Sequence, residues 1–272
     1  MMSKDSLNLT GVQETLLLPL WGRANETKKD NPLLIDSVAV RLIESIGYDF
    51  SIIEAKVNPL SCASWIARSI YFDDHIRLFL SQYPDGSIIN IGCGLDTTYD
   101  RINNNRAIWY EIDFPEVIEL RKKFIPETST RRFVPCSVLD PEWYNTIDNK
   151  KNVCIMIAGV IYYFDEGQVK KMFDKIAQEF VHSDIVVDYC SPKGVDIANK
   201  KVIKDNGMDK NACLKWGITD IHNIEKWNGK IKVLQTMKMF KDHRRKYPVF
   251  KRLGMLISDA LAVMSLAHLK IE

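Results

Sequence analysis

Residues 87–96 read Ser-Ile-Ile-Asn-Ile-Gly-Cys-Gly-Leu-Asp, an apolar run that ends in two glycines and is followed by a helical pattern. The run predicts a strand, and the glycines, which lack a Cβ, let a ligand approach bare backbone. A second strand-like run, 108–113, ends in Asp113, nineteen residues after Gly94. In a doubly wound sheet, an acid at this distance can accept hydrogen bonds from ribose hydroxyls. The two segments therefore predict a nucleoside site.

The residues after the glycines indicate which nucleoside. A dinucleotide-binding turn carries a third glycine where this chain has Thr97. Asp96 beside it would repel a pyrophosphate, whereas S-adenosylmethionine is cationic and has no phosphate. A Gly-x-Gly turn alone often serves only a tight turn, but the strand before it and the acid after it favour a ligand site. The sequence therefore predicts S-adenosylmethionine, with a nicotinamide-dependent oxidoreductase as an alternative.

Strand and helix patterns alternate from Asp85 onward, which predicts a parallel sheet with right-handed crossovers. Two more strand-like segments, 230–239 and 262–271, follow with a basic helix expected between them. We expect them to close the sheet as an antiparallel pair. The expected fold is α/β, a doubly wound, mostly parallel seven-stranded sheet. The first five strands are expected at 87–92, 108–113, 132–138, 152–158 and 184–190.

Helical patterns come before the first strand. They are expected from Thr10 to about Asn25, from about 35 to 46, and from a cap at Ser61 to about Gln82. We therefore expect residues 1–84 to form an N-terminal helical cap and residues 85–272 to form the ligand-binding domain. Within this domain, segment 191–229 is expected to be a lid-like insertion.

Composition excludes several classes of function. The chain has 272 residues, 46% of them apolar and 26% charged, which is typical of a globular protein. A formal net charge of +2 gives no reason to expect nucleic-acid or membrane partners. The six cysteines are scattered without metal-ligand spacing, so we expect no metal site and a reducing, cytoplasmic setting. The apolar stretch 16–21 is short and broken by Pro19, unlike a signal peptide.

Three consecutive motifs carry a family resemblance: Asn90-Ile-Gly-Cys-Gly-Leu-Asp-Thr-Thr-Tyr-Asp-Arg101, Tyr110-Glu-Ile-Asp-Phe-Pro-Glu-Val117 and Ser137-Val-Leu-Asp-Pro-Glu-Trp143. They resemble the leucine carboxyl methyltransferase family, and in particular its bacterial, tetracenomycin polyketide O-methyltransferase-like branch. Segments 14–24 and 64–68 also match the helical lead-in of that branch. The likeness covers about residues 10 to 240. It implies an S-adenosylmethionine-dependent O-methyltransferase of class I, but no particular substrate.

The resemblance also implies roles for individual residues. Gly92, Cys93 and Gly94 would pass under the amino-acid portion of the cofactor. Asp113, followed by Phe114, would hold the ribose hydroxyls, and Arg68 would pair with the cofactor carboxylate through its guanidinium fork. Ser137 and Val138 occupy the adenine-contacting positions. Many members have Asp in place of Ser137, so this chain offers the adenine amino group only a hydroxyl.

A second departure from the family pattern lies after the fourth strand. The family often has an acid there, where this chain has Ala158. Asp96 is a possible substitute for recognition of the methionine amino group. The departure also motivates an alternative, a methyltransferase fold that binds cofactor with altered or lost turnover.

The acceptor site is defined least well. Tyr162 and Tyr163 follow the fourth strand and could line the acceptor pocket, whereas Phe164 is expected to pack under the next helix. Four residues of the insertion could also contact the substrate: Lys210, Lys215, Trp216 and Trp227. A carboxylate acceptor needs no base and a phenol would gain from one. No histidine lies in a motif that marks it, so we name no general base. The acceptor, a small molecule or a peptide, and the oligomeric state are not specified.

Overall fold

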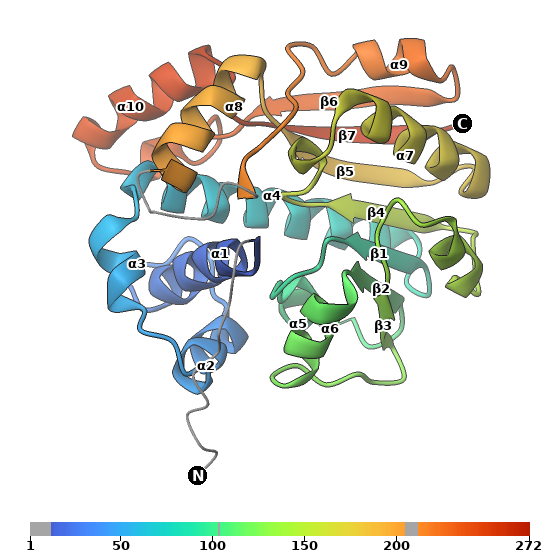
Figure 1. Ribbon diagram of the computed structural model, residues 1–272, viewed down its shortest axis with the longest axis horizontal. Helices are drawn as coiled ribbons and strands as arrows, with labels where there is room; N and C mark the ends of the chain where they lie inside the picture. Colours follow the sequence, from blue (N-terminus) through green and yellow to red (C-terminus); the bar gives the residue numbers. More distant parts are fainter. Residues whose placement is uncertain (1–11, 103, 205–211) are drawn as a thin grey trace.

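The computed structural model describes residues 12–102, 104–204 and 212–272. Its centre is a seven-stranded sheet in the order β3-β2-β1-β4-β5-β7-β6, in which β7 runs antiparallel to both of its neighbours and the first five strands are parallel (Figure 1). This confirms the predicted fold. The strands are β1 Ser87–Ile91, β2 Ile108–Asp113, β3 Arg131–Pro135, β4 Val153–Ile157, β5 Asp184–Tyr189, β6 Ile231–Lys238 and β7 Ser265–Ile271.

Burial explains why the central strands are so apolar. Every residue of β1 and β4 is buried, because helices cover both faces of a parallel sheet. The strand order reverses at β1, which pairs with β2 on one side and with β4 on the other. Ligands bind beyond the carboxyl ends of the strands at such a switch point. The predicted glycine turn lies at this point.

Helices pack around this sheet. The helices are α1 Val12–Thr27, α2 Ser37–Ser45, α3 Ser51–Lys56, α4 Pro59–Gln82, α5 Thr98–Ile102, α6 Pro115–Lys122, α7 Glu166–Glu179, α8 Pro192–Ala198, α9 Asn223–Trp227 and α10 Val249–Ala260. Shorter 3₁₀ or π turns are η1 Pro141–Thr146, η2 Ile161–Tyr163, η3 Asn199–Lys204 and η5 Arg244–Lys246. Helix α4 contacts β4 and β5, so it packs on the sheet itself. Within the described ranges, no helix is both long and apolar enough to span a membrane.

The structure differs from the helix predictions at three places. Helix α4 begins at Pro59, because the side chain of Asn58 accepts a hydrogen bond from the Leu60 N–H; Ser61 lies inside the first turn and is not the cap. Helix α3 was not predicted, since six residues carry little periodicity. The helix between β6 and β7 is α10, which is largely apolar, and the basic cluster 241–246 lies before it in a turn and in η5. The predicted start of the first helix at Thr10 lies outside the described residues.

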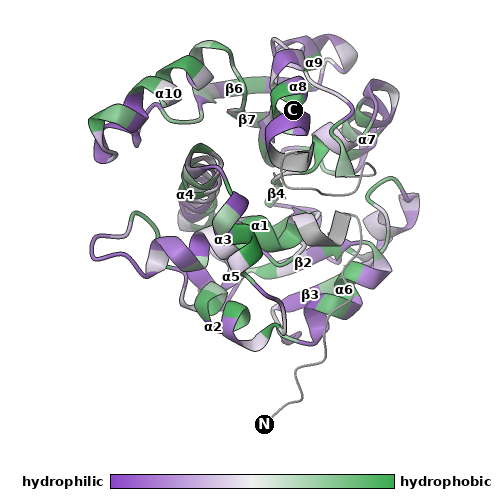
Figure 2. Ribbon diagram, turned by 60° about the vertical axis from the view of Figure 1, so that its left-hand side comes forward, coloured by the Kyte–Doolittle hydropathy of each residue, from purple (hydrophilic) through white to green (hydrophobic). Residues whose placement is uncertain are grey.

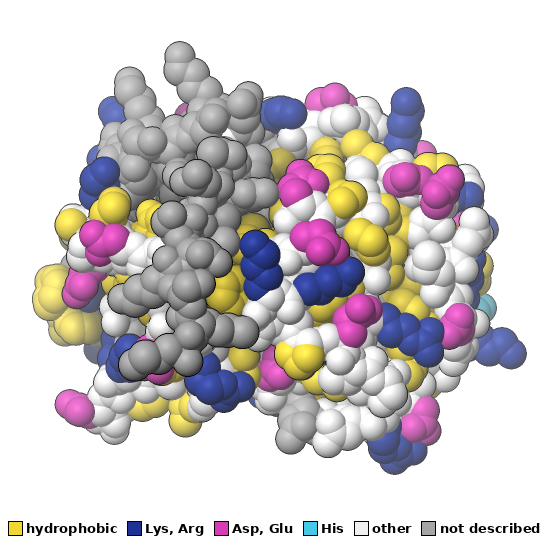
Figure 3. Space-filling view, turned by 60° about the horizontal axis from the view of Figure 1, so that its bottom comes forward, with side chains coloured by type: hydrophobic (Ala, Val, Ile, Leu, Met, Phe, Trp, Pro, Cys, Tyr) yellow, Lys and Arg dark blue, Asp and Glu magenta, His cyan; other side chains and the backbone are white. Residues whose placement is uncertain are grey.

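The N-terminal helices pack against the glycine turn. Buried side chains of α1 and α2 share one apolar cluster with Cys93 and Leu95. Figure 2 shows this apolar character along α1, which lies in front of the carboxyl ends of the strands. Helix α1 therefore covers the edge of the sheet where a ligand would bind, and α2 packs against α1. On the face seen in Figure 3, basic and acidic side chains are interspersed where described residues are visible.

Candidate active site

A cavity of about 1030 Å³ opens beyond the carboxyl ends of the strands. Its size suits a site for a cofactor together with a small molecule. The structure brings the predicted cofactor-binding residues and the two predicted tyrosines of the acceptor pocket to the wall of this one cavity. They are Arg68, Gly92, Cys93, Gly94, Asp96, Asp113, Phe114, Ser137, Val138, Ala158, Tyr162 and Tyr163.

The glycine turn has the backbone that its sequence implies. Gly92 and Gly94 have φ angles of +66° and +45°, a region that favours glycine. A Cβ on Gly92 would lie 2.3 Å from a methyl group of Val160, so the turn is also packed closely against its neighbours. Cys93 is buried, and this burial raises the pKa of its thiol well above the ordinary value. Cys93 therefore offers backbone, and no thiolate, to a ligand.

Asp113 joins the glycine turn to the end of β2. Its Oδ2 accepts a hydrogen bond from the Gly94 N–H at 2.7 Å, and its Oδ1 accepts one from the Phe114 N–H at 2.8 Å. Each carboxylate oxygen can accept a second hydrogen bond, so the side chain can also receive hydroxyl donors from the cavity. Burial raises the pKa of Asp113, although these two N–H donors act against that shift.

Glu111, two residues earlier on β2, faces away from the cavity. Its side chain is fully buried and forms an ion pair of 2.6 Å with Arg121 on α6. Arg121 also donates to the Gly94 carbonyl at 2.9 Å. The Glu111–Arg121 pair therefore supports the glycine turn from behind. Asp113 is the carboxylate at the end of β2 that borders the cavity.

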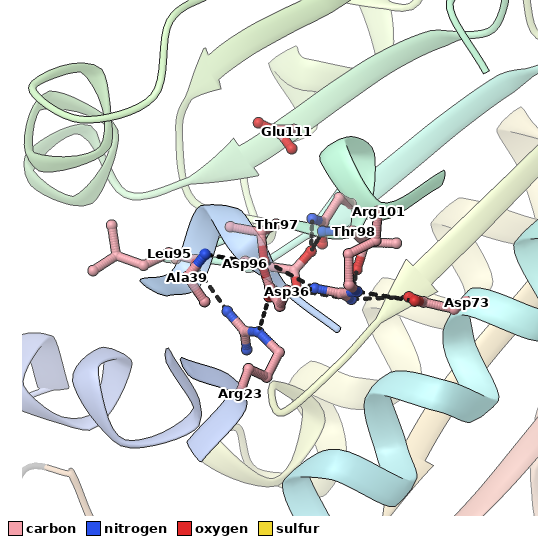
Figure 4. Close-up of polar contacts among 12 residues, drawn as sticks. Arg23, Asp36, Ala39, Asp73, Leu95, Asp96, Thr97, Thr98, Arg101 and Glu111 are labelled. Carbon is pink, nitrogen blue, oxygen red and sulfur yellow. Dashed lines mark hydrogen bonds and ion pairs between the residues drawn. The ribbon is translucent and has the colours of Figure 1, made fainter. Parts of the chain in front are cut away.

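A buried charge network holds the turn to the N-terminal helices (Figure 4). Asp36, the N-cap of α2, accepts hydrogen bonds on Oδ2 from Arg23 at 2.8 Å, from Thr97 at 2.5 Å and from Arg101 at 3.0 Å. Arg101 also forms two hydrogen bonds with Asp73 on α4. Thr97 is fully buried. This explains the residue at the place of the third glycine: its hydroxyl ties the turn to α2.

Arg68 of α4 also lines the cavity. Its Nη1 donates to Asp188 of β5 at 2.9 Å and to the hydroxyl of Tyr162 at 3.3 Å. Asp188 is fully buried, and its second oxygen accepts a hydrogen bond from the Gly159 N–H at 2.6 Å. Among the described residues, Nε and Nη2 of Arg68 have no hydrogen-bond partner. The guanidinium is therefore fixed by Asp188 and keeps donors for an anionic group.

Comparison of the sequence with known proteins shows the family of the chain. Residues 17–177, more than half of the chain, match the leucine carboxyl methyltransferase family. The chain belongs to this family. It is 28% identical over 223 residues to the tetracenomycin polyketide synthesis O-methyltransferase TcmP of Streptomyces glaucescens, an alignment that covers 81% of this chain and 80% of that protein. It is 26% identical to the S-adenosyl-L-methionine-dependent methyltransferase dpfgK of Gibberella zeae, over 68% of this chain and 66% of that protein.

Solved structures show the same fold. A DUF574 family protein from Streptomyces avermitilis superposes with a TM-score of 0.58 at 11% identity, over 93% of this chain and 97% of that one. The plantazolicin methyltransferase BamL superposes with a TM-score of 0.51 at 13% identity, over 96% of this chain and 99% of that one. The protein is an S-adenosylmethionine-dependent methyltransferase, and the oxidoreductase alternative is set aside.

The cavity wall fits this cofactor. Asp113 has lone pairs for hydroxyls, and Arg68 has donors for a carboxylate that no other described residue accepts. The carboxylate of Asp96 also borders the cavity. Burial acts to raise the pKa of Asp96, but the charges of Arg101 and Arg23 and hydrogen bonds from Thr98 lower it to about 2. Asp96 is therefore ionised at neutral pH, as recognition of a cationic ligand requires.

The two departures from the family pattern lie in this wall. Ser137 accepts a hydrogen bond from the Leu139 N–H at 3.2 Å, so its hydroxyl takes part in a turn at the cavity edge. Ala158 contributes no polar side chain to the wall. Beside it, however, Gly159 donates its N–H to the buried carboxylate of Asp188. An acid is therefore present close to the position of the missing one, but it comes from β5.

Aromatic and apolar side chains form much of the rest of the wall. Tyr162 and Tyr163 border the cavity with ring centroids 5.2 Å apart. Phe164, which was expected to pack under the next helix, packs against the core and also reaches the cavity wall. All five histidines lie in the described part of the chain, and none of them lines the cavity.

The insertion contributes to the wall unequally. Lys215 lines the cavity. Trp216 and Trp227 instead pack together, with ring centroids 5.9 Å apart, and do not line it. Lys210 lies outside the described residues. Of these four candidates, the structure therefore brings Lys215 to the cavity.

Sequence reasoning missed Asp188. The signal was an acid within the otherwise apolar run Ile185-Val-Val-Asp-Tyr of a buried strand. A charge in such a position is buried only when it is paired. The pattern could therefore have marked Asp188 as a paired acid, but it could not have identified Arg68 as the partner.

Proposed function

We propose that this methyltransferase transfers a methyl group to an oxygen, a carboxylate or a phenolic hydroxyl, of a small and largely apolar acceptor. The observation that carries the proposal is a set of side chains that line the cavity and do not belong to the glycine turn. It joins apolar and aromatic side chains to cations of the insertion. The residues are Phe72, Tyr162, Tyr163, Met239, Phe240 and Met264, with Lys201 and Lys215.

The chemistry of the acceptor follows from these groups. S-adenosylmethionine supplies an electrophilic methyl group, so the protein has mainly to align the acceptor oxygen. A carboxylate is ionised at neutral pH and needs no base, which agrees with a cavity that no histidine lines. Lys215 favours an anionic acceptor oxygen, whether carboxylate or phenolate. The printed name of TcmP, an O-methyltransferase, supports the same class of acceptor.

We assign the cofactor contacts as follows. Asp113 holds the ribose hydroxyls, and the turn 92–94 lies under the amino-acid portion. Arg68, fixed by Asp188, pairs with the methionine carboxylate. Asp96 supplies the charge that Ala158 lacks for the amino group, and Ser137 and Val138 border the adenine. Burial raises the pKa of Tyr162 well above its ordinary value, so its hydroxyl stays neutral. Because that hydroxyl accepts from Arg68, its proton is left to orient a ligand.

A labelled-methyl assay tests this proposal. The purified protein is incubated with methyl-labelled S-adenosylmethionine and a panel of aromatic carboxylic acids, phenols, peptides, amines and thiols. Transfer to a carboxylate gives a methyl ester that mild alkali cleaves, whereas a phenolic methyl ether survives the same treatment. Label on either kind of oxygen acceptor supports the proposal. Label confined to amines or thiols would contradict it.

A positioning variant adds a second readout. In Asp188→Asn, the amide has the same shape but no charge to fix Arg68. We expect the KM for S-adenosylmethionine to rise about tenfold or more, as for loss of a charge-assisted hydrogen bond. The KM for the acceptor should change little. Equal changes in both constants would indicate a general loss of structure in place of a role at the methionine end.

A further inference from the structure

Helix α10 presents apolar side chains to solvent. Val249, Phe250, Leu253, Leu256 and Ile257 are 74%, 77%, 64%, 46% and 51% exposed. Exposure of one large apolar side chain is common, but five on a single twelve-residue helix are unusual. Figure 2 shows α10 at the edge of the molecule, with apolar and polar stretches both visible on its ribbon.

These five residues form one stripe. Val249, Leu253 and Leu256 are spaced as i, i+4 and i+7, and Phe250 and Ile257 flank them at the same helical period. The opposite side of the helix is turned inward. There Met255 is buried, and Asp259 accepts hydrogen bonds from the Phe240 N–H at 3.1 Å and from Arg244 at 3.4 Å. The helix is thus held to the protein on one side, while its apolar stripe is exposed and reaches the cavity at Ile257.

Positive charge gathers at the N-terminal end of the stripe. Segment 241–252 contains six basic residues and a single acid, Asp242. Lys241, Arg245 and Lys246 are exposed, and Arg252 is held by hydrogen bonds to the carbonyls of Tyr247 and Arg245. An exposed apolar stripe with flanking cations is typical of a helix that lies in the interface of an anionic membrane.

We propose that α10 and its flanking basic segment bind an anionic lipid surface, with the stripe in the acyl boundary and the cations among the headgroups. The alternative partner is a second copy of the chain, whose own stripe could cover this one. A two-fold contact through the stripe would bring two basic segments into one interface, so repulsion between like charges would oppose it. Anionic headgroups complement the same charges. The net charge of +2 for the whole chain does not reveal this basic segment, because acidic residues elsewhere balance its charge.

The surface adjoins the cavity. Gly254, Ile257, Ser258 and Leu261 of the same helix region line the cavity wall. Docking through the stripe would therefore bring the rim of the cavity to the lipid. This gives a membrane-dissolved acceptor a short route to the site. The binding itself does not depend on which acceptor is methylated, so it can be tested separately.

Vesicle sedimentation tests the proposal with the full chain. One set of vesicles contains phosphatidylcholine alone, and the other contains phosphatidylcholine mixed with phosphatidylglycerol. We expect the protein to sediment with the mixed vesicles and to be released by high salt, which screens the headgroup charge. Phe250→Glu should weaken this partitioning about tenfold or more, because an aromatic side chain that would be buried in the lipid is replaced by a charge. Arg245→Glu should weaken it through the headgroup charge.

Leu78→Glu is the matched control. Leu78 is 58% exposed and lies near the end of α4, where the chain leads into the amino end of β1. It should bind vesicles like the wild type. Equal binding by wild type and Phe250→Glu would overturn the proposal, as would absence of binding to the mixed vesicles. A stable dimer in sedimentation velocity without lipid, dissociated by Phe250→Glu, would assign the stripe to a second copy instead.

Discussion

Asp113 and Glu111 lie two residues apart on β2, yet the structure gives them different tasks. Asp113 borders the cavity and receives the N–H groups of Gly94 and Phe114. Glu111 is fully buried against Arg121, behind the same turn. On an ideal strand both side chains project from one face, so period alone did not separate them. The difference is how far each lies from the end of the strand.

Alanine variants should separate the two acids. Asp113→Ala removes the acceptor that we propose for the ribose hydroxyls, with charge-assisted hydrogen bonds of about 1.5–3 kcal/mol, so cofactor affinity should fall roughly tenfold to a hundredfold. Glu111→Ala leaves Arg121 buried and unpaired, which should lower the free energy of unfolding by about 3–5 kcal/mol. Calorimetric titration and thermal melting measure both effects. If Glu111→Ala loses affinity while keeping its melting temperature, the ribose is placed wrongly.

Ser137 allows a gain-of-affinity test. The family resemblance implies an acid at this position in many members, and Ser137 lies at the cavity wall. Ser137→Asp should provide an acceptor for the adenine amino group and tighten cofactor binding several-fold, by about 1 kcal/mol. Ser129→Asp, a change outside the residues lining the cavity, is the control for added charge. Affinity that is unchanged or weaker in Ser137→Asp would argue against an adenine at this position.

The elements that precede the sheet act through the glycine turn. Thr97 donates to Asp36 on the N-terminal side of α2, and Arg101 connects the same carboxylate to Asp73 of α4. The turn is thus held in place by α2 and α4 as well as by its own strand. The helical segment that the sequence suggested as a cap is, in this network, a support for the turn.

Removal of one hydroxyl should test this support. Thr97→Val keeps the shape of the side chain but deletes the donor to Asp36. The free energy of unfolding should fall by about 1–3 kcal/mol, because a buried acceptor loses a partner. Cofactor affinity should fall as well, since the turn is less well fixed. Thr219→Val, at an exposed position, is the control and should change neither quantity. Identical melting curves for Thr97→Val and wild type would show that the Thr97–Asp36 hydrogen bond does not stabilise the turn.

Elements were predictable where pattern and length agreed. The alternation of apolar strands with helices determined β1 to β5, and the last two strand-like segments determined β6 and β7. Helix α3 was too short to show a period, and the cap of α4 depended on a choice between Asn58 and Ser61. Contacts between distant segments, such as Arg68 with Asp188, depend on how α4 packs on the sheet. No local pattern in the sequence encodes that packing.

Acid titration of the whole molecule reports on the network. Despite its burial, Asp96 has a pKa lowered to about 2, chiefly by Arg101 and Arg23, from an ordinary value of 3.8. A lowered folded-state pKa stabilises the fold above the ordinary value, and this stabilisation is lost as pH falls toward 2. The stability difference between wild type and Asp96→Asn, about 2 kcal/mol at neutral pH, should therefore shrink between about pH 4 and pH 2. Denaturant unfolding across this range measures it. A difference independent of pH would show that the charge of Asp96 is not what stabilises the protein.

The central claim is that this cavity binds S-adenosylmethionine and no dinucleotide. Calorimetric titration of the full chain with S-adenosylmethionine and, separately, with NADH tests it most directly. We predict saturable binding of S-adenosylmethionine with a dissociation constant below about 1 mM, and no heat from NADH beyond dilution. Absence of S-adenosylmethionine binding up to about 1 mM, or saturable binding of NADH, would contradict the account.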